Sequence, residues 1–286
     1  MLRQVTIIGV GLIGGSIGCA LKNNNACNKV IGYSRNENEL KKALELGVID
    51  HYYLDLVDAI RGSEIIVLAT PVGALEGIFR DLKFILDEDQ IITDVGSCKQ
   101  SVIKAAQEGL GYLPGYFIPG HPIAGTEKSG VDAAFDSLFK NRCTILTPLK
   151  HSDEYAIKRV RLMWELIGAE VVEMTAEHHD HVLAATSHLP HILAFSLVDT
   201  LAHMQEHSEI FRFAAGGFRD FTRIASSDPI MWRDICLQNK DAILEVLQIY
   251  EKQLNKLENA IQNADGEAIQ NMFENANRAR NEHVIQ

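Results

Sequence analysis

The distribution of apolar residues divides the chain into two parts with different secondary structure. In the first part, short runs rich in β-branched residues alternate with longer stretches of helical periodicity, which predicts a parallel sheet with crossover helices. We expect strands at Val5–Ile8, Val30–Tyr33, Ile65–Ala69, Ile91–Asp94, Tyr116–Pro119 and Thr144–Leu146. The intervening stretches that are long enough for crossover helices are Ile17–Asn23, Glu37–Leu46, Val72–Leu86 and Lys99–Gln107.

The second part begins after the strand-like run Glu170–Glu173, where the pattern becomes one amphipathic helix after another. This change predicts an α/β fold in which a Rossmann domain with a doubly wound, mostly parallel sheet, residues 1–174, precedes an all-α domain, residues 175–286. Leu189 to Leu201 is apolar on nearly every turn, which is typical of a helix buried on all sides and suits a dimer core. Asp241–Gln262 is expected to be a surface helix with one buried stripe.

Composition restricts the class of partner. The 286 residues, 47% hydrophobic and 23% charged, are those of an ordinary globular protein with room for two domains. The net charge of -11 disfavours nucleic acid or an anionic membrane as partner and favours small molecules. Five cysteines without a C-x-x-C pair indicate neither a disulfide framework nor a thiolate metal site. Because the apolar run Val5–Ile8 is too short for a membrane span or a secretory signal, we expect a cytoplasmic protein.

A glycine motif follows the first expected strand directly and opens a helix. Gly9 permits the tight turn, Gly11 lets the backbone amides approach a pyrophosphate, and Gly14 allows close packing of helix on strand. With Leu12 and Ile13 between them, these glycines place an anion at a helix N-terminus, where the dipole favours negative charge. In this context the motif predicts dinucleotide binding rather than a tight turn without ligand.

The end of the second strand bears on the choice of cofactor. An acidic residue normally stands there and accepts hydrogen bonds from the adenine ribose, but this chain has Ser34 and Arg35. Without a carboxylate at Ser34, repulsion of a 2′-phosphate is expected to be absent, and Arg35 offers a charge-assisted contact to it. The pair favours NADP, and NAD stays open because Arg35 also fits a solvated loop cation beside an NAD ribose.

Other chemistry gathers at the carboxyl edge of the expected sheet, where such folds bind ligands. Thr70 and Pro71 follow the third strand, and Ser97 follows the fourth and should face the nicotinamide. After the fifth strand, the glycine-bounded loop 120–130 brings His121 to the same edge. On spacing alone, His121 fits a catalytic imidazole and a surface loop residue equally well.

At this loop the sequence resembles the prephenate and arogenate dehydrogenase family. The resemblance extends through the blocks Ser187–His191, Gly216–Ala225 and Ser227–Trp232, and with the N-terminal glycine motif it spans nearly the whole chain. It implies a Rossmann domain followed by a helical domain that forms a homodimer, with the substrate held between them. The chain lacks the extra length of relatives that carry a fused mutase or regulatory domain, so it resembles the monofunctional members.

The resemblance also implies roles for individual residues. His121 matches the histidine that takes the proton from the substrate's ring hydroxyl, and Ser97 matches a serine bonded to that hydroxyl. Arg223 matches an arginine that pairs with a substrate carboxylate, which suits its bidentate guanidinium. His188 and His191 match two histidines beside the substrate, although His191 also fits a packed helix residue. Further candidates for substrate contacts are Thr126, Arg219 and Trp232, of which Trp232 fits a core position as well.

The implied reaction is the oxidative decarboxylation of prephenate to 4-hydroxyphenylpyruvate in tyrosine biosynthesis, with hydride transfer to NAD(P)+. Arogenate, giving tyrosine, is the alternative substrate, and His191 favours prephenate. A dehydrogenase of the 6-phosphogluconate or 3-hydroxyisobutyrate type would use a helical lysine, yet no lysine occurs between Lys158 and Lys240. A non-catalytic NAD(P)-binding regulator would keep the glycine loop without needing the Ser, His and Arg set.

Overall fold

The computed structural model of the chain describes residues 1–126 and 128–283, so Glu127 of the loop 120–130 lies outside the described residues. The chain divides into two compact units, residues 1–240 and 241–286. The first unit contains the sheets and all the residues proposed above for a site.

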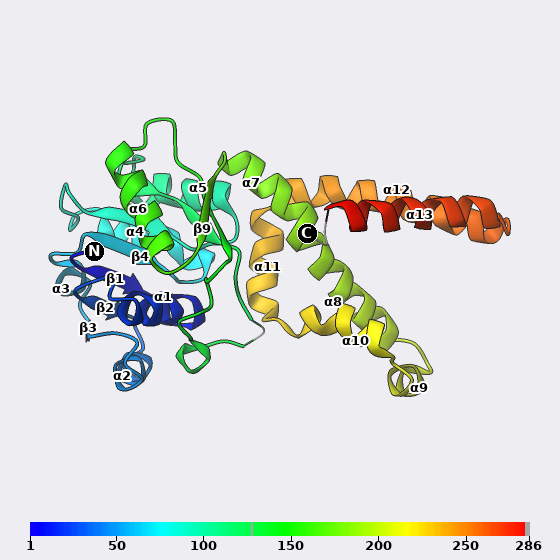
Figure 1. Ribbon diagram of the computed structural model, residues 1–286, viewed down its shortest axis with the longest axis horizontal. Helices are drawn as coiled ribbons and strands as arrows, with labels where there is room; N and C mark the ends of the chain where they lie inside the picture. The colour runs from blue at the N-terminus through cyan, green and yellow to red at the C-terminus, as the bar shows by residue number, and fades with distance from the viewer. Residues whose placement is uncertain (127, 284–286) are drawn as a thin grey trace. The chain divides into compact units, whose positions relative to one another are not determined.

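A parallel six-stranded sheet forms the centre of the first unit (Figure 1). Its strand order is β3-β2-β1-β4-β5-β6, so the order reverses between β1 and β4, and ligands of such sheets bind at this switch point. The strands are β1 Val5–Ile8, β2 Val30–Tyr33, β3 His51–Tyr53, β4 Ile65–Leu68, β5 Ile91–Asp94 and β6 Phe117–Ile118. The predicted doubly wound sheet is confirmed, with β3 as a short edge strand that the sequence pattern did not reveal.

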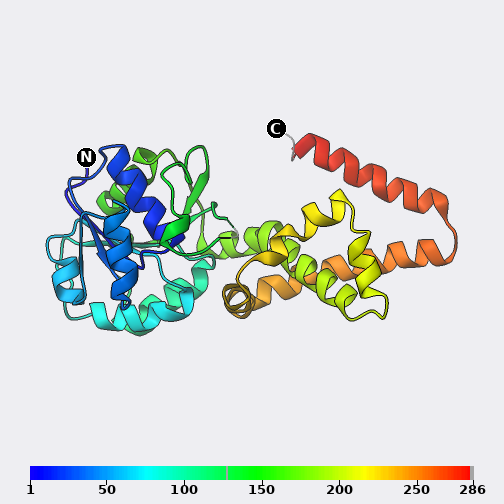
Figure 2. The ribbon, with the colours of Figure 1, turned by 90° about the horizontal axis from the view of Figure 1, so that it is seen from below.

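The central strands are buried on both faces, which explains why most of their residues are apolar. Alternate residues of β1 enter different cores: Val5 and Ile7 join one cluster, and Ile8 joins the other. The first cluster continues into α1 and α6, and the second into α4 and α5. Figure 2 shows helices on both sides of the sheet. They are α1 Leu12–Asn23, α2 Glu37–Glu45, α3 Leu56–Ile60, α4 Leu75–Leu82, α5 Lys99–Leu110 and α6 Glu154–Leu166.

Two of the predicted helices differ from the structure by more than three residues. Helix α1 begins at Leu12 and not at Ile17, because Gly11 is its N-cap and the glycine motif itself forms the first turn. The stretch Val72–Leu86, expected as one helix, is a 3-10 turn followed by α4. The earlier start of α1 has a functional consequence, since it places the helix N-terminus directly at the end of β1.

A second, three-stranded sheet corrects the predicted topology. It consists of β7 Gly120–Pro122, β8 Cys143–Leu146 and β9 Glu170–Glu173, with β7 antiparallel to β8 and β8 parallel to β9. The run Thr144–Leu146 therefore does not extend the main parallel sheet. His121, expected in a loop, lies in β7 opposite Ile145. A three-residue strand between a glycine and a proline carries too little periodicity to be recognised from sequence.

From residue 176 onwards the described residues form helices and their connections. In the first unit these are α7 Ala176–Leu183, a π-helical turn Ala184–His188, α8 Leu189–Ala202, α9 His207–Arg212, α10 Gly216–Thr222 and α11 Pro229–Gln238. Helix α8 was expected to be buried on all sides, but within the single chain only its Ala194 is fully buried. Ala176–Ala202 is long and apolar enough to cross a membrane by length and composition alone. However, Asp180 and His188 in this segment are bonded to other protein groups.

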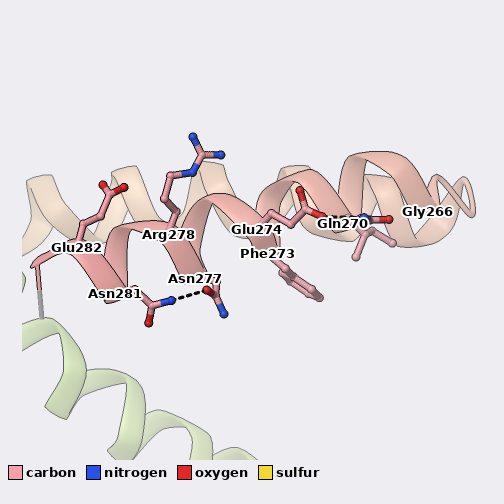
Figure 3. Close-up of a pocket in the computed structure, with 9 residues that line it drawn as sticks. Gly266, Gln270, Phe273, Glu274, Asn277, Arg278, Asn281 and Glu282 are labelled. Carbon is pink, nitrogen blue, oxygen red and sulfur yellow. Dashed lines mark hydrogen bonds between the residues drawn. The ribbon is translucent and has the colours of Figure 1, made fainter. Parts of the chain in front are cut away.

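The second unit contains the long helix α12 Lys240–Gln262, apart from its first residue, and α13 Gly266–His283. The expected buried stripe of α12 is incomplete: Ile243 and Ala260 are buried, whereas Ile249 and Leu254 are exposed. A hollow of about 760 Å³ lies along α13, and Figure 3 shows residues that line it, among them Phe273, Asn277 and Arg278. Its titratable lining residues are Glu274, Arg278 and Glu282, and they lie on the same helix as the rest of the lining. Since a single helix face lines the hollow, it does not have the converging walls of an active site.

Candidate active site

The loop between β1 and α1 has the geometry of a dinucleotide cradle. Gly9 has a φ of +95°, and a side chain there would meet the carbonyl oxygen of Ala69 at 2.6 Å. A Cβ at Gly14 would collide with the carbonyl oxygen of Gly9, so the helix approaches the loop as closely as glycine permits. Around Gly11, by contrast, no heavy atom lies within 4 Å of where a Cβ would stand. The backbone here is open to a ligand.

The N-terminus of α1 is available to an anion. Its N-cap Gly11 supplies no side-chain bond, so within the described residues the first N–H groups of the helix, including those of Leu12 and Ile13, lack a side-chain cap. Across the loop, the buried hydroxyl of Thr70 has no hydrogen-bond partner among the described residues, and Pro71 follows it at the exposed surface. An open backbone, helix N–H groups and an orphaned hydroxyl together fit the pyrophosphate and ribose of a nicotinamide dinucleotide.

The end of β2 differs from the expectation in one respect. The sequence has no carboxylate at Ser34, but the first turns of α2 bring one back: Ser34 Oγ donates to Glu39 Oε2 at 3.4 Å. The expected absence of repulsion towards a 2′-phosphate thus has to be weighed against the charge of Glu39, and the preference for NADP stays a prediction. Ser34 Oγ also accepts from the N–H of Asn36 at 3.1 Å, and Arg35 is exposed beside it. The sequence carried a signal for this contact. A turn at Asn36 that starts a helix brings Glu39, five positions after Ser34, back towards the end of β2.

His121 belongs to a chain of three side chains. Its Nδ1 lies 2.8 Å from Nε2 of His179, and Nδ1 of His179 lies 2.8 Å from Oδ1 of Asp180. Because a carboxylate only accepts, His179 carries its proton on Nδ1, and its Nε2 must then accept from His121. His121 therefore donates from Nδ1, and its Nε2 keeps a lone pair. This arrangement makes His121 Nε2 a proton acceptor.

Asp180 anchors the chain to the start of α5. Its two carboxylate oxygens accept from the backbone N–H groups of Lys99, at 2.7 Å, and Gln100, at 2.9 Å. These are orphan donors of the first helical turn, so a residue of α7 caps α5 from a distance. Burial alone would raise the pKa of Asp180, but the bonds from His179 and from these two N–H groups keep it below its usual range. Asp180 is thus an anion at neutral pH.

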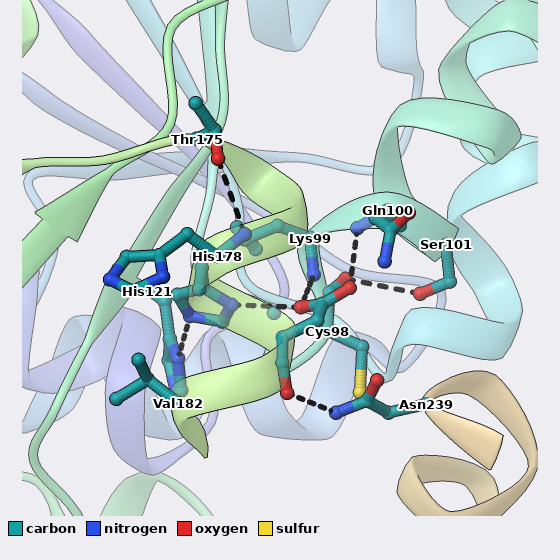
Figure 4. Close-up of polar contacts among 12 residues, drawn as sticks. Cys98, Lys99, Gln100, Ser101, His121, Thr175, His178, Val182 and Asn239 are labelled. Atoms are coloured by element: carbon teal, nitrogen blue, oxygen red, sulfur yellow. Dashed lines mark hydrogen bonds and ion pairs between the residues drawn. The ribbon is translucent and has the colours of Figure 1, made fainter. Parts of the chain in front are cut away.

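A buried ion pair holds the strand that carries His121. Lys99 Nζ lies 2.5 Å from Asp94 Oδ2 and 2.5 Å from the carbonyl oxygen of Gly120, while Gly120 N–H donates to Asp94 Oδ1 at 3.2 Å. Figure 4 shows Lys99 and His121 among the polar contacts of this region. Burial lowers the pKa of His121 well below its usual value, and the nearby charges of His179 and Lys99 lower it further. His121 is therefore neutral at pH 7 and ready to accept a proton.

His188 and His191 lie around the indole of Trp232. The ring of His191 stacks on Trp232 with centroids 3.7 Å apart and an interplanar angle of 18°, and His188 meets the indole edge-on at 6.1 Å. Asn239 Nδ2 bonds both the carbonyl oxygen of Asp180, at 2.7 Å, and His188 Nδ1, at 3.1 Å. Burial lowers the pKa of His188 to about 4. His188, predicted to lie beside the substrate, is thus connected to His121 through Asn239, Asp180 and His179.

The remaining predicted residues are more exposed. Ser97 is half-buried in the loop between β5 and α5, at the edge that carries His121, but the described residues show no hydrogen bond between the two. Thr126 is exposed, and its hydroxyl accepts from the N–H of Lys128 at 3.2 Å. Arg219 in α10 and Arg223 at the start of the following 3-10 turn are exposed. The structure does not bring these two arginines into contact with His121.

Trp232 also belongs to a small apolar cluster. It therefore fits both predictions made for it, a core residue and a candidate for substrate contact. It is 8% exposed and packs with Cys98 and Ile235. Its Nε1 is buried without a hydrogen-bond partner among the described residues. A groove of about 250 Å³ beside it is lined by Ile192, Phe195, Pro229, Trp232, Arg233 and Cys236. Apart from Arg233, this groove offers apolar walls beside the His191 ring.

Sequence reasoning missed the residues that hold the others in place. His179, Asp180, Lys99 and Asn239 are all buried, at 4% exposure or less. A signal in the sequence existed for two of these residues. His179 and Asp180 are adjacent polar residues in the first helix of the second part, shortly before the block that resembles the family. Buried polar residues require partners, but a sequence does not name those partners.

Comparisons with known proteins agree with this geometry. Residues 17–173 match the family model of the prephenate dehydrogenase nucleotide-binding domain, and residues 175–275 match that of the prephenate dehydrogenase dimerization domain. The chain is 40% identical over 283 residues to cyclohexadienyl dehydrogenase of Zymomonas mobilis, covering 98% of this chain and 96% of the relative. It is 39% identical to prephenate dehydrogenase of Bacillus subtilis, covering 96% of this chain and 75% of the relative.

A solved structure extends the similarity to three dimensions. Prephenate dehydrogenase of Aquifex aeolicus, in complex with hydroxyphenyl propionate and NAD+, superposes with a TM-score of 0.91 at 40% identity, covering 99% of this chain and 98% of that one. The family resemblance, the predicted fold class and the assignment as a nicotinamide-dependent dehydrogenase are confirmed. This chain belongs to the prephenate dehydrogenase family.

Proposed function

We propose that this enzyme converts prephenate to 4-hydroxyphenylpyruvate and carbon dioxide, and that it reduces a nicotinamide dinucleotide in the same turnover. One observation carries the proposal. The chain His121–His179–Asp180 leaves a neutral imidazole lone pair on Nε2, in a strand next to the sheet edge where the glycine loop would place a cofactor. A base of this kind is what the oxidation of a hydroxyl-bearing ring carbon requires.

The residues of the site account for the proton steps. His121 Nε2 takes the proton of the ring hydroxyl as that carbon loses hydride, and the resulting imidazolium is stabilised through His179 by the Asp180 carboxylate. When the ring carboxylate leaves as carbon dioxide, the electrons of its bond to the ring enter the ring and give a phenolate. His121 returns its proton to that oxygen. The dinucleotide, when bound, supplies the hydride acceptor. Ser97, at the same edge, is proposed to bond the hydroxyl.

Recognition of a dianion needs local cations inside an acidic protein. We assign the ring carboxylate to Arg223, whose guanidinium binds a carboxylate with two parallel bonds. Arg219 is the weaker candidate one helical turn earlier. His191 supports prephenate over arogenate, because a polar ring at this position suits the keto acid side chain. The apolar groove beside Trp232 and the exposed Thr126 complete the proposed substrate contacts.

The cofactor is proposed to bind with its pyrophosphate at the N-terminus of α1 and its adenine ribose at Ser34 and Arg35. We propose NADP as the preferred form because Arg35 is exposed at the position of the 2′-phosphate. Glu39 opposes this preference, since its carboxylate lies 3.4 Å from Ser34 Oγ. The balance between Arg35 and Glu39 decides the preference.

The proposed assembly is a cytoplasmic homodimer formed by the helical part of the chain. We place its boundary between residues 174 and 175, where the last strand gives way to helices. The support is twofold: the match to a dimerization domain, and the side chains of α8, of which only Ala194 is fully buried in the single chain. Light scattering at micromolar concentration would measure a dimeric mass, and a monomeric mass would contradict the proposal.

A two-by-two assay tests the function. Prephenate and arogenate are each combined with NAD and NADP, and reduction is followed at the nicotinamide absorbance band. We expect the highest kcat/KM with prephenate. An arogenate-specific enzyme would reduce the cofactor with arogenate alone, and a regulator would bind NAD(P) without any substrate-dependent reduction. Either result would replace the proposal by that alternative.

A further inference from the structure

Asn239 makes two hydrogen bonds that fix the state of a neighbouring histidine. It follows α11 and is 4% exposed. Its Nδ2 lies 2.7 Å from the carbonyl oxygen of Asp180, a contact drawn in Figure 4, and 3.1 Å from Nδ1 of His188. A carbonyl oxygen only accepts, so the amide must present its NH2 group on this side. The second hydrogen of that group then points to His188.

The consequence concerns the tautomer of His188. Its Nδ1 accepts the hydrogen bond from Asn239, so the neutral ring carries its own hydrogen on Nε2. His188 is 1% exposed, and burial lowers its pKa to about 4, which keeps the ring neutral at pH 7. It is therefore an uncharged N–H donor.

The other groups around His188 do not set this tautomer. The titratable groups that act on it are Asp180 and His179 of α7, His191 of α8 and, from β7, His121. The carboxylate of Asp180 is already bonded to His179 and to two N–H groups of α5. The indole of Trp232 meets the His188 ring edge-on. Asn239 is thus the group that contacts Nδ1.

We propose that Asn239 is a positioning residue for substrate recognition, which holds His188 as a neutral ring with its hydrogen on Nε2. The inference rests on the proposed function, in which His188 lies beside a dianionic substrate. In this tautomer Nε2 donates to an anionic oxygen without a second buried charge. In the other tautomer Nε2 would present a lone pair to the same oxygen, and the two acceptors would repel each other.

The tautomer is measured first in the unaltered enzyme. Selectively 15N-labelled histidine gives distinct nitrogen shifts for protonated and bare ring nitrogens, and His188→Gln identifies the signal that disappears. We expect a protonated Nε2 and a bare Nδ1 at pH 7. A protonated Nδ1 would overturn the proposal. This measurement uses no substrate, so it decides the Asn239 contact even if prephenate is not the substrate and the proposed function fails.

Asn239→Asp then tests the consequence for binding. A carboxylate can only accept, so His188 should acquire a proton on Nδ1 and its titration should move to higher pH by about one unit or more. The KM for prephenate should rise roughly tenfold and become pH-dependent, with a smaller change in kcat.

A matched control separates this effect from general damage. Asn24 also donates to a carbonyl, that of Leu166 at 2.9 Å, and the structure gives it no contact with a histidine. Asn24→Asp should leave the His188 signal and the KM unchanged. An Asn239→Asp enzyme with a switched tautomer and an unchanged KM would refute the role in recognition. If this variant fails to fold, the spectrum of the unaltered enzyme still decides whether His188 has the tautomer that the contact with Asn239 requires.

Discussion

The proposed base and the proposed recognition residues are held in different ways. His121 is joined through His179 and Asp180 to the first turn of α5, and the members of that chain beyond His121 are fully buried. The arginines proposed for recognition, Arg223, Arg219 and Arg35, are in contrast exposed. The base is thus positioned by the fold before any ligand arrives, whereas these exposed side chains can adjust to the ligand.

This contrast follows from the cost of burial. A buried polar group that loses its partner costs about 1–3 kcal/mol, so each member of the buried chain depends on the next. An exposed side chain can exchange its partners with water at little cost. Changes in the buried chain should therefore affect turnover and stability together, and changes in the exposed recognition arginines should affect binding alone.

The largest effect is expected for His121→Asn. The amide cannot accept a proton at neutral pH, so turnover should fall by roughly 10²–10⁴ while substrate binding stays within a few-fold. Steady-state kinetics with prephenate measures both quantities. Near-normal turnover would remove His121 from the mechanism and with it the functional meaning of the buried chain.

A smaller loss is expected when the chain is broken one residue further from the substrate. His179→Gln removes the ring that orients His121, and kcat should fall by up to about 10²-fold because the base is misplaced. The adjacent His178 is exposed on the same helix, so His178→Gln is the matched control and should keep full activity. Equal kinetics for the two variants would show that His121 needs no orienting partner.

The same contrast explains what could be predicted from the sequence. Val5–Ile8 and Ile65–Leu68 are rich in β-branched residues because both faces of these strands are buried, and a glycine motif follows the first, so the sheet and the cofactor loop were predictable. Strand β7 and the partners of Asp180 were not. Their contacts join residues far apart in the chain, such as Lys99 and Asp180, and no local periodicity encodes such a pairing.

Substitutions of Arg223 test the prediction for the exposed recognition residues. Arg223→Lys keeps the charge but loses the planar fork, so the KM for prephenate should rise by an amount equivalent to roughly 1–3 kcal/mol, and Arg223→Ala should cost more. Cofactor affinity and Tm should stay constant in both variants. A large fall in Tm with normal substrate affinity would instead identify Arg223 as a structural ion-pair partner.

The smallest effects are expected at the proposed site of the adenine ribose. There the exposed side chains of Arg35 and Glu39 act in opposite directions on NADP binding. Arg35→Ala should raise the Kd for NADP about two- to fivefold and leave that for NAD nearly unchanged, since exposed charge pairs contribute little. Glu39→Gln should lower the Kd for NADP by a similar factor, because it removes a negative charge next to Ser34. Fluorescence titration with each dinucleotide measures the four constants.

Glu45 lies at the other end of α2, so Glu45→Gln is the control for a general change of charge. Equal effects of Arg35→Ala on the Kd for NADP and for NAD would show that Arg35 does not pair with the 2′-phosphate. An unchanged Kd for NADP in Glu39→Gln would mean that the Glu39 carboxylate turns away when the cofactor binds.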